Sequence, residues 1–282
     1  MKVRTNLRIF RYIKDGSGAE RMDARLKKDG ETITWVAYPD FCDDNCKVIA
    51  VSPTVGCVGR CKFCVSGRTR PFKRRLLKEE MAAQVLPCLD GRKGQKVNFA
   101  CEGDFCSNFY NCCGAIEFLL RIGHNLSFIA TTIGDVRVLK NFLRARANLP
   151  VTFYWSVNFL EEDMLAYYMP GAINGGSLVK KRDAFQSISR KTGRKTTASW
   201  VVMAGLNDSR EDAERLDGFF GGRPEFEIKL MALEPGSLPN IETSQEDVAR
   251  FAGYLGEFGL PYRMRQIIGR EIKAGCGTTV PL

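Results

Sequence analysis

The sequence predicts an α/β fold, built on a largely parallel sheet with helices packed outside it. The chain has 282 residues, 44% of them hydrophobic, and a chain of this size buries about three quarters of its unfolded surface. From about residue 47 the pattern repeats strand, loop and helix six times, which implies a parallel sheet. The sheet can form an open barrel or a doubly wound layer. Both place their chemistry at the carboxyl ends of the strands.

The six units follow one another without a linker or a repeat. Strands are expected at Val48–Val55, Lys96–Cys101, Leu126–Thr132, Thr152–Val157, Thr196–Met203 and Glu225–Leu233. Helices are expected at Leu77–Leu89, Asn111–Ile122, Asp135–Ala145, Leu178–Lys191, Ser209–Phe220 and Ser244–Phe258. Glycines just past most of these helices are typical helix ends, and Ser209 with Asp212 resembles a capping box.

The residues before the first unit predict β structure. Alternating or β-branched segments occur at Arg4–Tyr12, Glu20–Lys27 and Thr32–Tyr38. Asp15-Gly16 and Asp29-Gly30 lie between them as turn signals. We therefore divide the chain into an N-terminal β extension, residues 1–46, and a core, residues 47–282.

Positive charge is concentrated in two parts of the chain. The net charge is +10, and residues 57–78 hold eight Lys or Arg and no acid. A second basic run contains Lys180, Lys181, Arg182, Arg190, Lys191, Arg194 and Lys195. Clustered basic residues point to an anionic partner, a nucleic acid or a nucleotide. A solvated face is the alternative for each run.

The composition also limits where the protein works. No stretch approaches the roughly 18 consecutive apolar residues of a membrane helix, and the N-terminal sequence lacks the apolar segment of a signal peptide. We expect no membrane association and a cytoplasmic location. Eleven cysteines in a reducing compartment favour metal or redox chemistry over disulfides.

Three of the cysteines follow the first expected strand directly. Cys57, Cys61 and Cys64 have the spacing C-x3-C-x2-C. Three thiolates on so short a loop can ligate three irons of a 4Fe–4S cluster, because Gly56 and Gly59 let the backbone wrap closely. The fourth iron can then bind the amino and carboxylate groups of S-adenosylmethionine (SAM). Transfer of one electron to the sulfonium would release a 5′-deoxyadenosyl radical.

With Phe63 before its third cysteine, this triplet resembles the signature of the radical SAM superfamily. The alternative is a zinc site with a distant fourth ligand. Structural zinc sites usually pair two C-x2-C knuckles, but the sequence has no second knuckle and His124 is its only histidine. The spacing, the aromatic residue and the strand–loop context favour the cluster.

Other segments narrow the resemblance to the RlmN/Cfr family, which methylates adenine carbons in ribosomal and, for some members, transfer RNA. They are Val51–Cys64, Trp155–Pro170, Val201–Asp212, Ile228–Gly236 and Gly269–Gly277. The resemblance implies a partial (β/α)6 TIM-like radical SAM barrel, here with an N-terminal β-hairpin extension. It also implies an enzyme with SAM and a 4Fe–4S cluster, a nucleic acid or nucleotide substrate, and a low-potential electron donor such as a flavodoxin or ferredoxin.

The same resemblance implies a SAM pocket. The family's Gly-Glu pair is similar to Gly103-Asp104, where an Asp still offers a carboxylate to an ammonium group. Phe63 is the aromatic residue of the cluster motif. Further cofactor-binding positions of the family resemble Thr131, Ser156, Val157, Asn158 and Asn207. All of them fall at the carboxyl ends of expected strands.

In the family a cysteine near the C-terminus is methylated by one SAM, and a radical from a second SAM activates that methyl group. Cys276, in Ala274-Gly275-Cys276-Gly277, resembles this methyl carrier. An inert buried thiol is the alternative. Its position after Arg270-Glu271-Ile272 favours the carrier.

The chain departs from the family in three places. The resolving cysteine, seven residues before Cys57, is replaced by Ala50. The general-base glutamate is replaced by Thr34 ahead of Pro39, so neither release of the adduct nor deprotonation has an obvious agent. We expect no counterpart of the family's N-terminal helical RNA-binding domain, because only β structure is expected ahead of the cluster motif, and a nucleotide or nucleoside is then a plausible smaller target.

The remaining cysteines leave a second reading open. Cys42, Cys46, Cys101, Cys106, Cys112 and Cys113 could ligate an auxiliary iron–sulfur cluster, although small buried core residues are the more usual role. An auxiliary cluster would suit a radical SAM enzyme with different chemistry on a small nucleotide metabolite. A non-catalytic iron–sulfur or nucleic-acid-binding protein is the third possibility, but a pure binder needs no cleavable cofactor.

Overall fold

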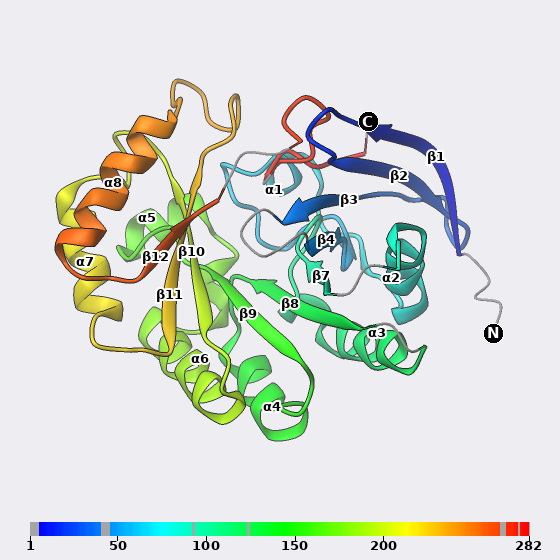
Figure 1. Cartoon of the computed structure of the whole chain (residues 1–282), viewed down its shortest axis with the longest axis horizontal. Helices are drawn as coiled ribbons and strands as arrows, with labels where there is room; N and C mark the ends of the chain where they lie inside the picture. Colours follow the sequence, from blue (N-terminus) through cyan, green and yellow to red (C-terminus); the bar gives the residue numbers. More distant parts are fainter. Residues whose placement is uncertain are drawn as a thin grey trace.

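The computed structural model describes residues 6–40, 46–91, 94–122, 125–265, 269–275 and 277–281. Within these residues, ten strands form one sheet in the order β1-β2-β3-β4-β7-β8-β9-β10-β11-β12 (Figure 1). Its parallel part consists of β4 (Cys46–Val51), β7 (Gln95–Phe99), β8 (Leu126–Thr132), β9 (Val151–Ser156), β10 (Thr196–Val202), β11 (Phe226–Ala232) and β12 (Tyr262–Met264). The predicted α/β class is confirmed. The six predicted strands are all present, and β12 is one that the sequence analysis missed.

The N-terminal extension continues this sheet. Its strands β1 (Leu7–Lys14), β2 (Glu20–Leu26) and β3 (Thr32–Asp40) pair antiparallel. β3 also pairs antiparallel with β4, so that Val36 is opposite Ala50. The extension is therefore a three-stranded meander that shares its sheet with the parallel core.

Helices cover the outer face of the parallel strands (Figure 1). The helices are α1 (Val65–Thr69), α2 (Lys78–Val85), α3 (Phe109–Arg121), α4 (Val136–Ala145), α5 (Glu162–Tyr168), α6 (Leu178–Thr192), α7 (Arg210–Phe220) and α8 (Gln245–Glu257), with short 3-10 turns η1 (Leu86–Cys88), η2 (Cys106–Asn108) and η3 (Ala172–Gly175). The capping box of Ser209 and Asp212 is confirmed at α7. The short helices α1 and α5 were not predicted.

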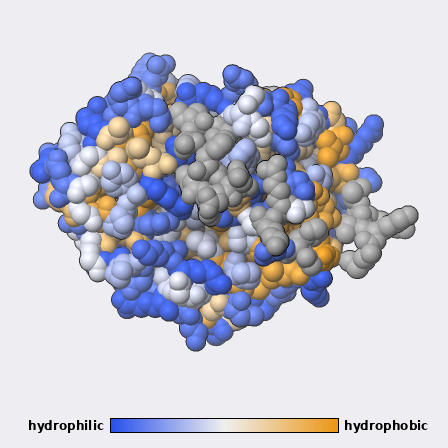
Figure 2. Space-filling view, in the orientation of Figure 1, coloured by the Kyte–Doolittle hydropathy of each residue, from blue (hydrophilic) through white to orange (hydrophobic). Residues whose placement is uncertain are grey.

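The core lies between this face of the sheet and the helices. Aromatic rings meet there edge to face, as Phe142 and Phe153 do with centroids 4.8 Å apart, and such pairs add stability beyond the apolar area they bury. Apolar residues on the surface gather on the side of β1, α2 and α3 (Figure 2). No helix in the described part of the chain is long and apolar enough to cross a membrane.

A two-stranded ribbon, β5 (Thr54–Val55) with β6 (Arg74–Arg75), stands apart from the main sheet. It closes the loop that leaves β4, and that loop contains the cysteine triplet and α1.

Candidate active site

The cysteine loop, residues 56–64, is fixed by main-chain contacts at both ends. The amide of Cys57 donates to the carbonyl of Arg70 at 3.0 Å, and the amide of Cys64 donates to the carbonyl of Cys61 at 3.2 Å. Gly56 has φ +74°, and a Cβ atom there would overlap the carbonyl of Pro71. A glycine is therefore required where the loop leaves β5.

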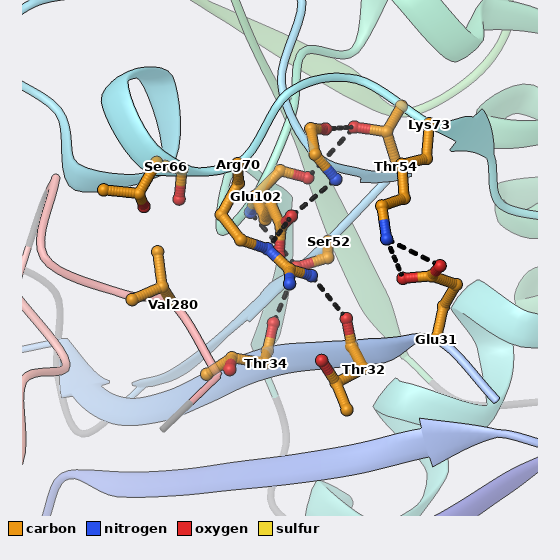
Figure 3. Close-up of polar contacts among 12 residues, drawn as sticks. Glu31, Thr32, Thr34, Ser52, Thr54, Ser66, Arg70, Lys73, Glu102 and Val280 are labelled. Carbon is orange, nitrogen blue, oxygen red and sulfur yellow. Dashed lines mark hydrogen bonds and ion pairs between the residues drawn. The ribbon is translucent and has the colours of Figure 1, made fainter.

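An ion pair between a partly buried arginine and a buried glutamate anchors this loop to the sheet. Arg70 Nε lies 3.0 Å from Glu102 Oε1, and Arg70 Nη2 donates to the carbonyl of Thr32 on β3 at 2.6 Å (Figure 3). Glu102 also accepts from the amide of Gly56. Burial raises the pKa of the Glu102 carboxyl, and Arg70 opposes that shift. Arg70 and Glu102 thus join the cysteine loop to the N-terminal extension.

A cavity of about 190 Å³ lies beside the cysteine loop. Its lining includes all three thiols of the triplet. The wall continues along the inner face of the sheet through residues of β4, β7, β8, β9, β10 and β11, at Ala50, Asn98, Thr131, Ser156, Ser199 and Lys229. The carboxyl ends of the parallel strands and the cysteine loop therefore enclose one space, as the fold class predicts.

The donor set of this loop fits an iron–sulfur cluster. Burial raises the pKa of Cys57 to about 12 and that of Cys61 well above its ordinary value, and the nearby Cys64 adds to both shifts. Bound metal cations would favour the thiolate form of these cysteines, because a coordinating thiol is deprotonated. Gly59 lies directly against two of these thiols, since a Cβ atom there would be in van der Waals contact with Cys57 Sγ at 3.4 Å and with Cys61 Sγ at 3.5 Å.

A single metal ion fits this set less well. Among the residues that the structure describes, no group of three or more His, Cys, Asp or Glu side chains is arranged to hold one ion. A cubane cluster does not need that convergence, because each cysteine binds a different iron. The described residues give no support to the zinc alternative.

Most of the predicted SAM-binding residues line the cavity. They are Phe63, Gly103, Asp104, Thr131, Ser156 and Asn158. Gly103 has φ +116°, and a Cβ atom there would overlap Thr54. Thr131 Oγ1 donates to Asn98 Oδ1 at 2.8 Å.

The carboxylate of Asp104 is buried next to the carboxyl end of β8. It accepts from Thr132 Oγ1 at 3.0 Å, from the amide of Ile133 at 2.7 Å and from the amide of Ser107 at 3.2 Å. Burial raises the pKa of the Asp104 carboxyl in spite of these bonds. A cationic ligand beside it would favour the charged form.

Two of the predicted SAM-binding residues do not line this cavity. Val157 packs in the core. Asn207 accepts from the amide of Met203 at 2.7 Å and donates to the carbonyl of Asn158 at 2.9 Å. Asn207 therefore contacts Asn158, which lines the cavity, and does not line the cavity itself. The Oδ1 atom of Asn158 accepts from the amide of Val201 at 2.7 Å.

The C-terminal segment, residues 269–275 and 277–281, forms the part of the wall next to the cysteine loop through Ala274, Gly275, Gly277 and Thr279. It is tied to the helix after the triplet: the amide of Val65 donates to the carbonyl of Gly277 at 2.7 Å, and Ser66 Oγ donates to the carbonyl of Thr279 at 2.9 Å. Cys276 itself lies outside the described residues.

The two positions that depart from the family have different surroundings. Ala50 lines the cavity and shares a buried cluster with Ala274 and Ile272. Thr34 is fully buried, and its Oγ1 donates to Asp23 Oδ1 at 2.5 Å. Thr34 is therefore part of a polar contact inside the N-terminal extension.

The other described cysteines are scattered. Cys112 lies in the core with its Sγ 3.8 Å from Met81 Sδ, and Cys46 Sγ contacts the carbonyl of Gly94. Cys106 and Cys113 are likewise buried in the core. Only Cys101 among them lines the cavity, and Cys42 lies outside the described residues. Nothing in the described part of the chain supports an auxiliary cluster.

The basic runs are less open than the sequence suggests. Lys73 pairs with Glu31 at 2.7 Å, and Arg74 pairs with Glu80 at 2.8 Å. Lys181 is fully buried, where its Nζ donates to the carbonyls of Ile133 and Ala172. Acids outside the first run, Glu80 just after it and Glu31 well before it, thus neutralise part of its charge.

Sequence reasoning missed several polar residues on the cavity wall. Lys229, Glu234 and Arg265 line it, as do Asn98 and Ser199. Lys229 is a charged residue at an inward position of β11, between the buried residues Ile228 and Leu230. Charged residues that alternate with buried apolar residues along a strand, here Glu227 and Lys229, are the signal that points to such a site.

Comparisons with known proteins identify relatives of the chain. No protein-family model matches the chain. A probable RNA methyltransferase of Azoarcus sp. (strain BH72) is 30% identical over 269 residues, which cover 92% of this chain and 72% of that protein. A probable dual-specificity RNA methyltransferase RlmN of Dictyoglomus turgidum is 27% identical over 89% of this chain and 72% of its own length.

The fold is also that of a solved structure. A radical SAM methyltransferase from Sphaerobacter thermophilus superposes with a TM-score of 0.87 at 24% identity, over 97% of this chain and 81% of that one. The cysteine loop, the polar carboxyl ends of the strands and the relatives agree. The chain belongs to the RlmN/Cfr-like family of radical SAM enzymes.

Proposed function

We propose that this enzyme transfers a methyl group from SAM to an adenine carbon of RNA or of a nucleotide, with Cys276 as the carrier. The observation that carries the proposal is the shared cavity. The cysteine loop lines it, and so do Gly275 and Gly277, the neighbours of Cys276. Gly277 lies directly against this loop, since a Cβ atom there would be 3.3 Å from the carbonyl oxygen of Phe63. A carrier on that segment would work beside the site of SAM cleavage, as the family's chemistry requires.

The chain's own residues supply the cofactor sites in this proposal. Cys57, Cys61 and Cys64 would hold a 4Fe–4S cluster, which when reduced supplies one electron to bound SAM. A low-potential donor such as a flavodoxin or ferredoxin would provide that electron. Gly103 lets the backbone before Asp104 pack against Thr54, and the buried carboxylate of Asp104 would bind the ammonium group of the ligand.

Hydrogen bonds between polar side chains and the backbone stabilise the cavity wall near Asn158. The Asn158–Asn207 pair fixes the backbone where β9 and β10 end. Asn158 has φ +57°, a conformation that a side-chain amide tolerates and a branched residue does not. We propose that Asn207 acts as a support for Asn158 and not as a direct SAM ligand.

An anionic substrate suits the far end of the cavity. Lys229 and Arg265 both line it and offer positive charge to a phosphate group. The relatives named above are RNA methyltransferases, which supports RNA as the substrate. A free nucleotide carries the same phosphate chemistry.

The test is turnover of the reconstituted holoenzyme with methyl-labelled SAM. A structured RNA and free AMP serve as separate substrates, and mass spectrometry locates the label. We expect labelled methyladenine in the RNA and S-methylcysteine at Cys276. Methylation of AMP alone would identify a nucleotide enzyme.

Matched cysteine variants sharpen the test. Cys276→Ala should abolish product while leaving SAM bound. Cys101→Ala removes another cavity thiol and should leave methyl transfer intact. Cleavage of SAM with an unmethylated Cys276 would contradict the carrier and favour different radical chemistry on the same scaffold.

A further inference from the structure

Arg21, on β2, is fully buried and bonds to the C-terminal segment. Its Nη1 donates to the carbonyls of Ile272 at 3.2 Å and Lys273 at 3.0 Å, and its Nη2 donates to the carbonyl of Val280. These carbonyls lie on both sides of position 276. One guanidinium thus holds both arms of the segment.

Two further buried groups fix that guanidinium. Asp23 Oδ1 lies 3.2 Å from Arg21 Nη2 and accepts from Thr34 Oγ1 at 2.5 Å. Neither side chain of the Arg21–Asp23 pair is exposed to solvent. A buried charge is tolerated only when it is paired and hydrogen-bonded. The contacts with Asp23 therefore hold the planar guanidinium group of Arg21 in one position.

Other contacts show that the segment closes the cavity. Arg270 Nε lies 3.1 Å from Glu234 Oε2, and the carboxylate of Glu234 packs so closely under Gly275 that a Cβ atom there would lie 2.5 Å from Oε1. The amide of Val65 holds Gly277. The segment is therefore attached to the loop after β11, to α1 and, through Arg21, to the N-terminal extension.

We propose that Arg21 is a positioning residue, which clamps both arms of the C-terminal segment so that it closes the cavity beside the cysteine loop. Its planar fork is suited to this task, because it reaches several carbonyls at once where a lysine ammonium cannot. Thr34 then has a role of its own, as support for Asp23. The inference rests on the proposed function only where it concerns methyl transfer by Cys276.

The test needs a variant that loses the clamp and keeps the fold. Arg21→Met alone would leave Asp23 buried without its partner. The triple variant Arg21→Met, Asp23→Leu and Thr34→Val removes the whole polar cluster, and apolar replacement of a buried ion pair is often neutral for stability. Arg25→Met is the matched control, an exposed arginine on the same strand.

Amide hydrogen exchange of the holoenzyme measures how firmly the C-terminal segment is held, and this measurement does not depend on activity. The amides of Lys273, Ala274 and Thr278 are bonded within the segment. In the triple variant they should exchange about tenfold faster or more, as in local opening, while amides of β7 and β8 stay unchanged. Unchanged exchange at all three amides in the folded variant would overturn the proposal.

A second readout separates positioning from general damage. Iron content, SAM affinity and formation of 5′-deoxyadenosine should stay within about twofold of wild type, while methyl transfer falls by about tenfold or more. Equal losses of SAM cleavage and methyl transfer would also overturn the proposal. If wild type itself never methylates Cys276, the proposed function fails, and the exchange experiment still decides the role of Arg21.

Arg21→Lys provides the variant for the case in which the triple variant does not fold. It keeps the charge beside Asp23 but cannot span both arms. We expect faster exchange in at least one arm. Wild-type exchange in both arms would contradict the clamp.

Discussion

Ala50 and Ala274 belong to the same small buried cluster on the cavity wall, although 223 residues separate them in the sequence. Ala50 is the position at which relatives of the family have their resolving cysteine, by the resemblance described above. A thiol at this position would lie in the cavity beside the segment that contains Cys276.

Ala50→Cys should therefore speed release of a substrate that is bound covalently to Cys276. We expect the adduct to persist in wild type and to be released about tenfold faster in the variant, because a positioned thiol replaces a bimolecular reaction by an intramolecular one. Intact-protein mass spectrometry after a single turnover measures the adduct.

Ala130→Cys is the control for this change. Ala130 is fully buried in β8 but belongs to the main core, so its thiol should leave the adduct unchanged. Equal effects of the two cysteines, or none from Ala50→Cys, would show that position 50 has no role in release.

Replacing Cys57, Cys61 and Cys64 with Ala should abolish 5′-deoxyadenosine formation and remove the cluster absorbance. The three thiols are the protein ligands in our proposal, and no step can start without the electron that the cluster supplies. Cys112→Ala should keep both signals, since Cys112 lies in the core. SAM cleavage at the wild-type rate by the triple variant would disprove the site.

Asp104→Asn should weaken SAM binding and should make the stability of the SAM-free protein less dependent on pH. The amide loses a charged hydrogen bond to the ligand, worth about 1.5–3 kcal/mol, or roughly 10- to 100-fold in affinity. Isothermal titration measures the affinity.

The pH dependence has a definite sign. Burial raises the pKa of Asp104 in the folded protein, so the folded state holds its proton more tightly than the unfolded state. The stability due to this proton is complete below the unfolded pKa and is lost as pH rises through the folded pKa. The free energy of unfolding of Asp104→Asn should not fall over this pH range. If the free energies of unfolding of the variant and of wild type changed with pH in the same way, the effect of burial on Asp104 would be contradicted.

Arg70→Met should destabilise the protein by about 3 kcal/mol, since it leaves the buried Glu102 carboxylate without its cation. Chemical denaturation measures the change, and iron content shows whether the cysteine loop is lost with it. The double variant Arg70→Met and Glu102→Leu should recover most of the stability, because no unpaired charge remains. A double variant no more stable than Arg70→Met would mean that the pair matters through its hydrogen bonds to Gly56 and Thr32.

The sequence predicted the parallel core well, because its strands are buried apolar runs with glycine-terminated helices between them. β12 escaped because Tyr262–Met264 is short and its residues are partly exposed. The helix α1 escaped because it is one turn long and is set by the packing of Gly67 against Cys61. Such contacts carry no periodic signal.

Residues of the candidate site could be predicted where a sequence motif contains them. Residues that reach the cavity only through tertiary contacts could not. Gly103 and Asp104 stand at the cavity as expected, but Asn207 is one contact removed from it. The buried Lys181 was counted with surface charge because its neighbours in the helix are exposed. Only the fold shows which carbonyls it reaches.

The clamp at Arg21 has a consequence for the order of assembly. Its bond to Ile272 joins residues 251 apart in sequence, and contacts of such long range form late, since the entropy of closing the intervening chain must be met first. Until they form, the wall made by the C-terminal segment is absent and the cysteine loop faces solvent. Iron–sulfur insertion would then have its easiest entry in a nearly complete chain whose first and last segments have not yet met.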